Sequence, residues 1–178
     1  YIDAMGGTIQ VESKLGEGTT FVVEIPMEIL SVDGMENQDQ TDQKNSEMQL
    51  QGKRVLIAED NDLNAEILET LLQDRGIQYV RAENGKEALD LFAARPEGSF
   101  DAILMDIMMP EMDGYEATRR IRSMKDRPDG EKIPIIAMTA NAFAEDMQAS
   151  LAAGMNAHLT KPIEIDSLMR TISNQLKK

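Results

Sequence analysis

The sequence contains no cysteine and no tryptophan, and aromatic residues make up only 4% of its 178 residues. Without cysteine there can be no disulfide bond, no thiolate metal site and no cysteine nucleophile. Because aromatic side chains are so few, the core has to be aliphatic, with the 13 methionines as deformable filler. The hydrophobic share of 42% is nevertheless sufficient for a buried core.

Basic residues are scarce as well, since 18 Lys and Arg stand against 32 Asp and Glu, a formal net charge of −14. Such an acidic surface repels nucleic acid phosphates and anionic lipids, so we expect no nucleic-acid partner and no direct membrane contact. Apolar runs long enough to span a bilayer are missing, as is a signal peptide, and we expect a cytoplasmic location. The chain starts at Tyr1 without an initiator methionine, which indicates a piece of a longer protein.

Three segments of the chain differ in composition. Residues 1–30 alternate apolar and polar side chains around a glycine-containing bend, which predicts two strands, at 8–12 and 20–25. A hairpin alone is marginally stable in water, so this segment should lack an independent fold. Residues 31–51 are mostly Gln, Asn, Asp, Glu and Ser, which predicts a flexible acidic linker.

Residues 52–178 alternate short apolar runs with amphipathic patterns. The runs predict five strands, at Arg54–Ala58, Gln78–Ala82, Ala102–Asp106, 133–138 and Ala157–Thr160. Between them we expect helices with one apolar face each, for example Leu63, Ile67, Leu71 and Leu72 in the first helix and Leu168, Met169 and Ile172 in the last. Repeated strand–helix units predict an α/β domain, a doubly wound parallel sheet with helices on both faces.

Open parallel sheets bind ligands at the carboxyl ends of the strands, where the strand order reverses. With right-handed crossovers, the flavodoxin-like order 2-1-3-4-5 places the ends of the first and third strands side by side. The first strand runs into Glu59 and Asp60, and the third ends in Asp106. Three converging carboxylates disfavour ionisation unless a cation binds, and a set of oxygen ligands favours Mg²⁺.

The fourth and fifth strands would add a hydroxyl and an ammonium to the same edge, from Thr139 and Lys161. A carboxylate, a divalent cation, a hydroxyl and a fixed positive charge together suit phosphoryl transfer. The cations neutralise the oxygens of the transferring group, and the Asp106 carboxylate can form an acyl phosphate.

Four motifs in this segment resemble those of response-regulator receiver domains. They are VLIAEDN at 55–61, LMDIMMPEMDG at 104–114, MTA at 138–140 and the pair Lys161–Pro162. The resemblance covers residues 53–178, and its four motifs occur in the family's order. Receiver domains also have the strand order 2-1-3-4-5, so the predicted order is not independent of the resemblance.

The resemblance assigns roles to individual residues. It implies that Asp106 is the phosphorylated residue and that the bond between Lys161 and Pro162 is cis. It further implies that Thr139 and Lys161 contact phosphoryl oxygens. The Mg²⁺ ligands would be Glu59, Asp60, Asp106 and the backbone carbonyl of Met108.

Residues 1–30 resemble the tail of a histidine-kinase ATPase domain, through MGGTIQVES at 5–13 and GEGTTF at 16–21. Kinase tail, linker and receiver follow in this order in bacterial hybrid sensor kinases, some of which are anchored in a membrane. The resemblance implies two partners, the histidine-bearing donor domain of a kinase and a histidine phosphotransfer protein. The sequence leaves open whether the domain forms a weak homodimer. The kinase core is missing here, so we expect no useful ATP binding by these residues.

His158, the only histidine, lies three residues before Lys161, where many receivers carry an aromatic side chain that turns inward on activation. A switch role and an indifferent surface position both remain open for it.

Two other functions compete with the receiver hypothesis. One is an aspartyl-phosphate phosphohydrolase of the haloacid-dehalogenase type, but such enzymes carry a second Asp two residues after the nucleophile, where this chain has Met108. The other is a protein-interaction module that has lost phosphorylation. The acidic pair, the Thr and the Lys are all present, which argues against such a loss.

Overall fold

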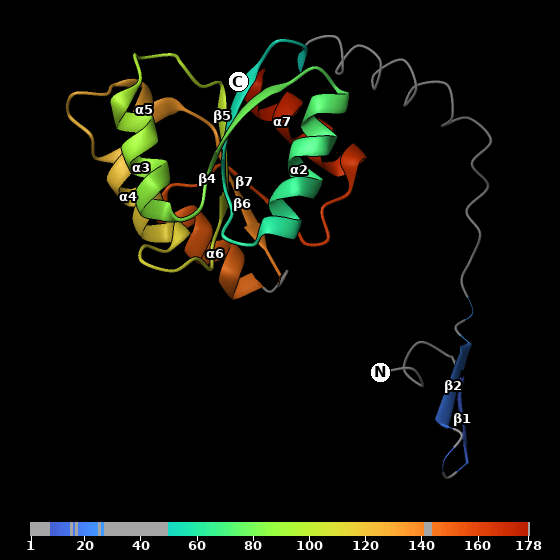
Figure 1. Cartoon of the computed structure of the whole chain (residues 1–178). Coiled ribbons are helices and arrows are strands. Elements are labelled where there is room, and N and C mark those ends of the chain that lie inside the picture. The colour runs from blue at the N-terminus through green and yellow to red at the C-terminus, as the bar shows by residue number, and fades with distance from the viewer. Residues whose placement is uncertain are drawn as a thin grey trace. The chain divides into compact units, whose positions relative to one another are not determined.

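The computed structural model describes residues 8–14, 16, 18–24, 26, 50–140 and 144–177, the side chains of 144 and 145 excepted. The chain divides into two compact units, one within Tyr1–Gln38 and the other within Asp39–Lys178 (Figure 1). Most of the predicted linker at 31–51 lies outside the described residues. Its last two residues are described, and Leu50 is only 1% exposed, packed in the core of the second unit.

The first unit contains the predicted hairpin, made of β1 (Thr8–Lys14) and β2 (Gly18–Glu24). The strands pair antiparallel, with Ile9 opposite Val23 and Val11 opposite Phe21. These four apolar side chains therefore share one face of the hairpin, and they are 46% to 65% exposed. The strands run closer to the bend than expected because the ladder continues to Lys14 and Gly18.

The second unit is built on a five-stranded parallel sheet in the order β4-β3-β5-β6-β7, which confirms the predicted order 2-1-3-4-5. Its strands are β3 (Arg54–Ala58), β4 (Gln78–Ala82), β5 (Ala102–Asp106), β6 (Ile135–Thr139) and β7 (Ala157–Thr160). Four of these five strands have the predicted bounds. The exception is β6, which begins after Pro134, because proline has no N–H to donate to a ladder. It also extends to include Thr139.

Helices cover both faces of this sheet (Figure 1). They are α2 (Asp62–Asp74), α3 (Gly85–Ala94), α4 (Gly114–Arg122), the short α5 (Asp129–Lys132), α6 (Ala144–Ala153) and α7 (Ile165–Leu176). Buried residues of α2 and α7 pack on one face, and those of α3 and α4 on the other. Among the described helices, none combines the length and the hydropathy needed to cross a bilayer.

The predicted buried face of α2 is partly wrong. The helix buries Ala65, Leu68 and Leu72, whereas Leu63 is 66% exposed and Ile67 is 46% exposed. Two adjacent stripes of this helix are apolar, and the one with the small Ala65 lies against the sheet. For α7 the prediction is confirmed, since Leu168, Met169 and Ile172 are all buried.

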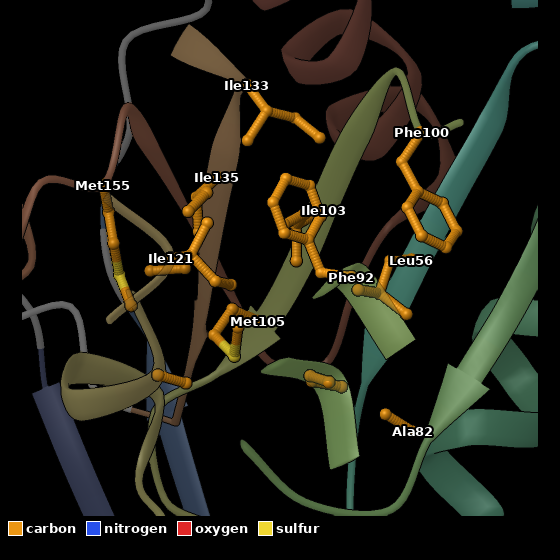
Figure 2. Packing of buried hydrophobic residues seen from close by; sticks show 14 of the residues in the cluster. Leu56, Ala82, Phe92, Phe100, Ile103, Met105, Ile121, Ile133, Ile135 and Met155 are labelled. Atoms are coloured by element: carbon orange, nitrogen blue, oxygen red, sulfur yellow. The ribbon is translucent and has the colours of Figure 1, made fainter. Parts of the chain in front are cut away.

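The core is aliphatic, as the composition predicts, with two phenylalanines added. Figure 2 shows Ile103 and Ile121 beside Phe92, which is completely buried. The rings of Phe92 and Phe100 stack with their centroids 6.4 Å apart.

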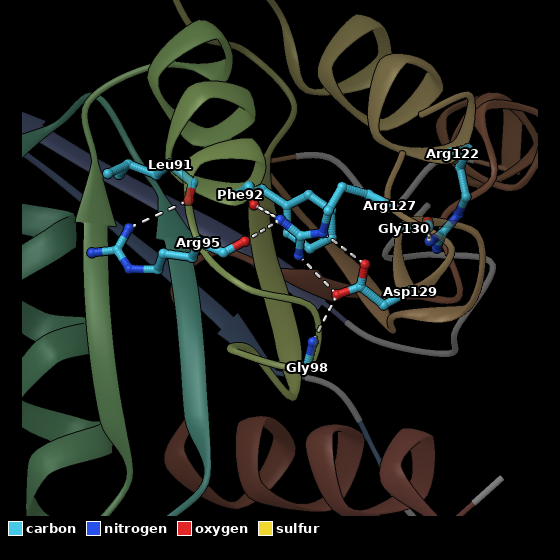
Figure 3. Close-up of polar contacts among 8 residues, drawn as sticks. All are labelled: Leu91, Phe92, Arg95, Gly98, Arg122, Arg127, Asp129 and Gly130. Atoms are coloured by element: carbon cyan, nitrogen blue, oxygen red, sulfur yellow. Dashed lines mark hydrogen bonds and ion pairs between the residues drawn. The ribbon is translucent and has the colours of Figure 1, made fainter. Parts of the chain in front are cut away.

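A largely buried ion pair lies at the end of the domain opposite the carboxyl ends of the strands. The Arg127 guanidinium lies over the Phe92 ring, 4.1 Å from its centroid, and donates to the backbone oxygens of Phe92 and Arg95 (Figure 3). It also forms two hydrogen bonds with the carboxylate of Asp129, at 2.9 and 2.8 Å. That carboxylate accepts a third from the Gly98 N–H, at 3.0 Å. The pair thus joins the end of α3 to the connection between α4 and β6.

Acid should weaken this ion pair. The hydrogen bond from Arg127 is the main cause that holds the pKa of Asp129 below its ordinary value of 3.8. Its contribution to folding is complete above that value and is lost as the pH falls through the lowered pKa. We expect Asp129→Asn to lower the free energy of unfolding by about 1–2 kcal/mol at pH 7. The difference should shrink below pH 3.8.

Urea unfolding of both proteins between pH 7 and pH 3 measures this effect. Asp90→Asn serves as the control, because Asp90 is 66% exposed and pairs on the helix surface with Lys86, its one ion-pair partner among the described residues. A deficit in Asp129→Asn that stays constant across the pH range would contradict the assignment.

Candidate functional site

Three carboxylates meet at the carboxyl ends of β3 and β5. These strands are neighbours, so Glu59 and Asp60, which follow β3, lie beside Asp106, the last residue of β5. Each of the three offers an oxygen, and these oxygens all lie within 4.8 Å of one another. Glu59 is fully buried and Asp106 is 6% exposed, whereas Asp60 is exposed. The structure thus forms a crevice with buried acids at its base and one acid at its rim.

Lys161 bridges the two buried acids. Its Nζ lies 2.6 Å from Oδ2 of Asp106 and 2.6 Å from Oε2 of Glu59. Burial by itself lowers the pKa of Lys161, but the hydrogen bonds and charges of Asp106 and Glu59 outweigh it, so the net shift is upward. The side chain is therefore a fixed positive charge at the crevice. Its bond to Pro162 is cis, as the resemblance implies.

Thr139 and Met108 lie at the same edge. Thr139 ends β6 and is 9% exposed, and its backbone oxygen accepts a hydrogen bond from the Lys161 N–H at 2.8 Å. The Met108 N–H donates to Oδ1 of Asp106 at 3.2 Å, while the Met108 side chain is 80% exposed. Both carboxylate oxygens of Asp106 therefore have a donor within the chain. That the Met108 carbonyl is a metal ligand stays a prediction.

Asn64 is a site residue that the sequence alone did not reveal. Its Nδ2 donates to Oε1 of Glu59 at 2.9 Å, so that both oxygens of the buried Glu59 carboxylate have partners. Asn64 lies in the first turn of α2, which Asn61 caps by accepting from the Asn64 N–H at 3.0 Å. The position of Asn61 before an apolar helix marks the helix start, but the turn that aims Asn64 at Glu59 is visible only in the structure.

Gly114 lies against the end of β5. A Cβ at this position would overlap the backbone oxygen of Asp106 and come within 3.0 Å of the Met105 side chain. The Gly114 N–H donates to the backbone oxygen of Ile107 at 3.0 Å. The loop after Asp106 can therefore fold back this closely only because residue 114 has no side chain.

Gly114→Ala should displace the end of β5. We expect it to lower the free energy of unfolding by about 2 kcal/mol, as overpacking does, and to slow any reaction of Asp106. Urea unfolding and the rate of phosphate incorporation would measure the two effects. The matched control is Gly52→Ala, whose φ of +79° makes it strained by about 1 kcal/mol but whose Cβ would meet nothing within 4 Å. Equal effects of the two changes on Asp106 reactivity would contradict the prediction.

His158 lies on β7, three residues before Lys161, and both residues line a pocket at the end of this strand. The His158 side chain is exposed and, because side chains alternate, points to the face opposite the buried Leu159. It lines a groove of about 370 Å³ together with residues of α6 and α7, among them Met147 and Thr171. The switch role stays a prediction.

The donor set fits a hard divalent cation. Three carboxylates face one lysine, which leaves two negative charges to be balanced. Carboxylate and carbonyl oxygens, with room for water at the exposed Asp60, are the surroundings that Mg²⁺ prefers. Glu59, Asp60 and Asp106 are the residues that could hold it.

Comparisons with known proteins agree with this geometry. A hybrid signal transduction histidine kinase, kinase I of Dictyostelium discoideum, is 41% identical over 128 residues, and the match covers 71% of this chain but 7% of that kinase. The receiver domain of sensor histidine kinase PA1611 from Pseudomonas aeruginosa, solved with magnesium in its active site cleft, is 36% identical. It superposes with a TM-score of 0.64 over 71% of this chain and 99% of that one.

A further solved structure is the Saccharomyces cerevisiae complex of the histidine phosphotransfer protein Ypd1 with the receiver domain of Ssk1. It matches at 32% identity and a TM-score of 0.64, over 71% of this chain and 90% of the matched chain. The family described as response regulator receiver domain matches residues 55–173. Together with the sheet order and the acidic crevice, this match shows that the chain belongs to the response regulator receiver domain family.

Proposed function

We infer that this chain is a phosphorelay receiver in which Asp106 carries the phosphoryl group. A carboxylate oxygen of Asp106 attacks the phosphorus of a phosphohistidine on a kinase, so that a P–O bond forms and the P–N bond breaks. A histidine nitrogen of a phosphotransfer protein then attacks the same phosphorus, and the P–O bond breaks to regenerate the carboxylate. The observation that carries this proposal is the contact of a half-buried lysine, at 2.6 Å, with an aspartate that shares its crevice with two further acids.

Each residue of the crevice has a part in this transfer. Lys161 would move from the Asp106 carboxylate to an oxygen of the incoming phosphoryl group, and the Thr139 hydroxyl would donate to another. Glu59, Asp60, Asp106 and the Met108 carbonyl would hold Mg²⁺, which supplies positive charge to the phosphoryl oxygens. The PA1611 receiver, solved with magnesium in its active site cleft, supports Mg²⁺ as the cation.

The partners follow from the same chemistry. The donor would be the phosphohistidine of a kinase, and the acceptor a histidine phosphotransfer protein, as in the Ypd1 complex. We assign residues 1–30 to the end of a kinase ATPase domain, 31–51 to a linker and 52–178 to the receiver, in a bacterial hybrid kinase with this domain in the cytoplasm. The burial of Leu50 supports a receiver that begins slightly before residue 52.

Phosphate incorporation from a small phosphodonor tests the proposal. With acetyl phosphate and Mg²⁺, intact-protein mass spectrometry should show one added phosphoryl group, and EDTA should prevent it. The labelled protein should then lose the group to a histidine phosphotransfer protein. Failure to label with Mg²⁺ demonstrably bound would favour an interaction module instead.

Sustained turnover of phosphate esters would favour the phosphohydrolase alternative. One position disfavours a phosphohydrolase. The residue two after Asp106 is Met108, which is 80% exposed and offers no carboxylate.

A further inference from the structure

Arg81 lies beside the acidic crevice without being one of the residues that form it. It is the fourth residue of β4 and pairs in register with Ile57 of β3. Side chains alternate along a strand, so Arg81 points to the same side of the sheet as Tyr79, which packs in the cluster containing α2. Ala82 packs in the opposite cluster. The Arg81 side chain therefore extends toward the start of α2.

The guanidinium contacts both ends of the segment that contains Asp60. Its Nη2 donates to Oδ1 of Asp62 at 2.6 Å and lies 3.5 Å from the backbone oxygen of Glu59. The Asp62 side chain is 93% exposed, whereas that of Arg81 is 24% exposed. The buried Nε of Arg81 has no hydrogen-bond partner among the residues that the structure describes, so the tip of the side chain makes the contacts that orient it. Arg81 thus connects β4 to the loop between β3 and α2.

Asp60 depends on the backbone of this loop. The neighbouring Glu59 is held by Asn64 and Lys161, one at each carboxylate oxygen. Asp60 is exposed, and within the described part of the chain no hydrogen bond or ion pair holds its carboxylate. Its distance from Asp106 is therefore decided by where the loop lies.

We propose that Arg81 is a positioning residue for the metal ligand Asp60. By tying Glu59 and Asp62 to β4, it holds the Asp60 carboxylate at the distance from Glu59 and Asp106 that a cation requires. This inference rests on the proposed function, since it concerns the same site. If Arg81 acted only through its charge, its loss would strengthen Mg²⁺ binding, because a positive charge near the crevice repels a divalent cation.

Arg81→Gln separates the two roles. Loss of a residue that orients a metal ligand typically weakens binding 10- to 100-fold, and we expect Mg²⁺ affinity to fall about 10-fold. A Mg²⁺ titration followed by the amide NMR shifts of the loop measures the affinity directly. Phosphate incorporation from acetyl phosphate should need correspondingly more Mg²⁺ but reach the wild-type rate at saturation. A general loss of structure would instead lower that maximal rate.

Arg54→Gln is the matched control. Arg54 lies at the start of β3, at the opposite end of the sheet, where its guanidinium donates to Gln78 at 2.8 and 3.2 Å. This variant should bind Mg²⁺ as the wild type does. If Arg81→Gln binds Mg²⁺ equally or more tightly while the wild type binds and is labelled, the positioning role is overturned and the proposed function stands. A wild type that neither binds Mg²⁺ nor takes up phosphate overturns both.

Discussion

Asp106→Asn should abolish phosphate incorporation. The amide keeps the shape of the side chain and leaves an oxygen for the Met108 N–H, but it lacks the negatively charged oxygen that attacks phosphorus. We expect neither of the other two carboxylates in the crevice to replace it, because Glu59 is fully buried and Asp60 lies at the rim. We expect labelling by acetyl phosphate with Mg²⁺ to fall to the background of a reaction without protein.

The same strand offers the matched control. Asp101 immediately precedes β5, at its other end, where its carboxylate accepts from Lys53 Nζ at 2.9 Å and from the Arg54 N–H at 2.8 Å. Asp101→Asn also removes one carboxylate beside this strand, but far from the crevice. This variant should take up phosphate at the wild-type rate. Normal labelling of Asp106→Asn, or phosphate located by peptide mass spectrometry on another residue, would rule out the assignment.

Lys161→Ala should have a large effect on stability that depends on the divalent cation. In the wild type the ammonium neutralises two carboxylates that have almost no access to water, since Glu59 is fully buried and Asp106 is 6% exposed. Without it, two like charges face each other in a buried crevice. Breaking a buried ion pair in this way costs about 3–5 kcal/mol. We expect a loss of this size in EDTA, and Mg²⁺ should restore much of it by taking over the neutralisation.

Urea unfolding in EDTA and in saturating Mg²⁺ measures this dependence. The control is Lys53→Ala, because Lys53 is 40% exposed and its pair with Asp101 should contribute less than about 1 kcal/mol in either condition. An equal loss for Lys161→Ala with and without Mg²⁺ would contradict competition between lysine and metal for the same acids. Phosphorylation of Lys161→Ala should also change fewer amide NMR shifts than in the wild type, because the lysine no longer links phosphate to β7.

The pH dependence of this contact follows from the raised pKa of Lys161. A group whose pKa is raised in the folded protein contributes fully below its ordinary value, here 10.5, and loses that contribution as the pH rises through the higher folded value. The Lys161 contribution is therefore complete at neutral pH, and the comparison of the variants in EDTA and Mg²⁺ is best made there.

Much of the fold could be predicted because its signals are local. Five runs of apolar residues indicated the strands, and four of the five have the predicted bounds. The handedness of crossovers then left few sheet orders to consider, and all the acidic residues of the crevice stand directly at strand ends. Strand β6 begins later than predicted because of Pro134. The prediction followed the apolar residues and passed over the rule that proline avoids the interior of a sheet.

The errors and omissions concern contacts between residues that are distant in sequence. The apolar pattern of α2 allows two stripes, and only packing on the sheet decides that Leu68 is buried and Ile67 is exposed. The composition of residues 31–51 hides the fact that Leu50 packs in the core. The short helix α5 was not foreseen, and neither were the contacts of Arg127 with the backbone oxygens of Phe92 and Arg95, which lie at the end of a different helix.

The strands and the chemistry at their ends could be read from the sequence, because apolar runs and the residues that follow them are properties of neighbours along the chain. How those residues meet depends on the folded structure. Lys161 contacts Glu59 across 102 positions of sequence, and Arg81 reaches Asp62 from the adjacent strand. Such contacts depend on how helices pack on the sheet and how closely the loops approach, and no local pattern records the resulting distances.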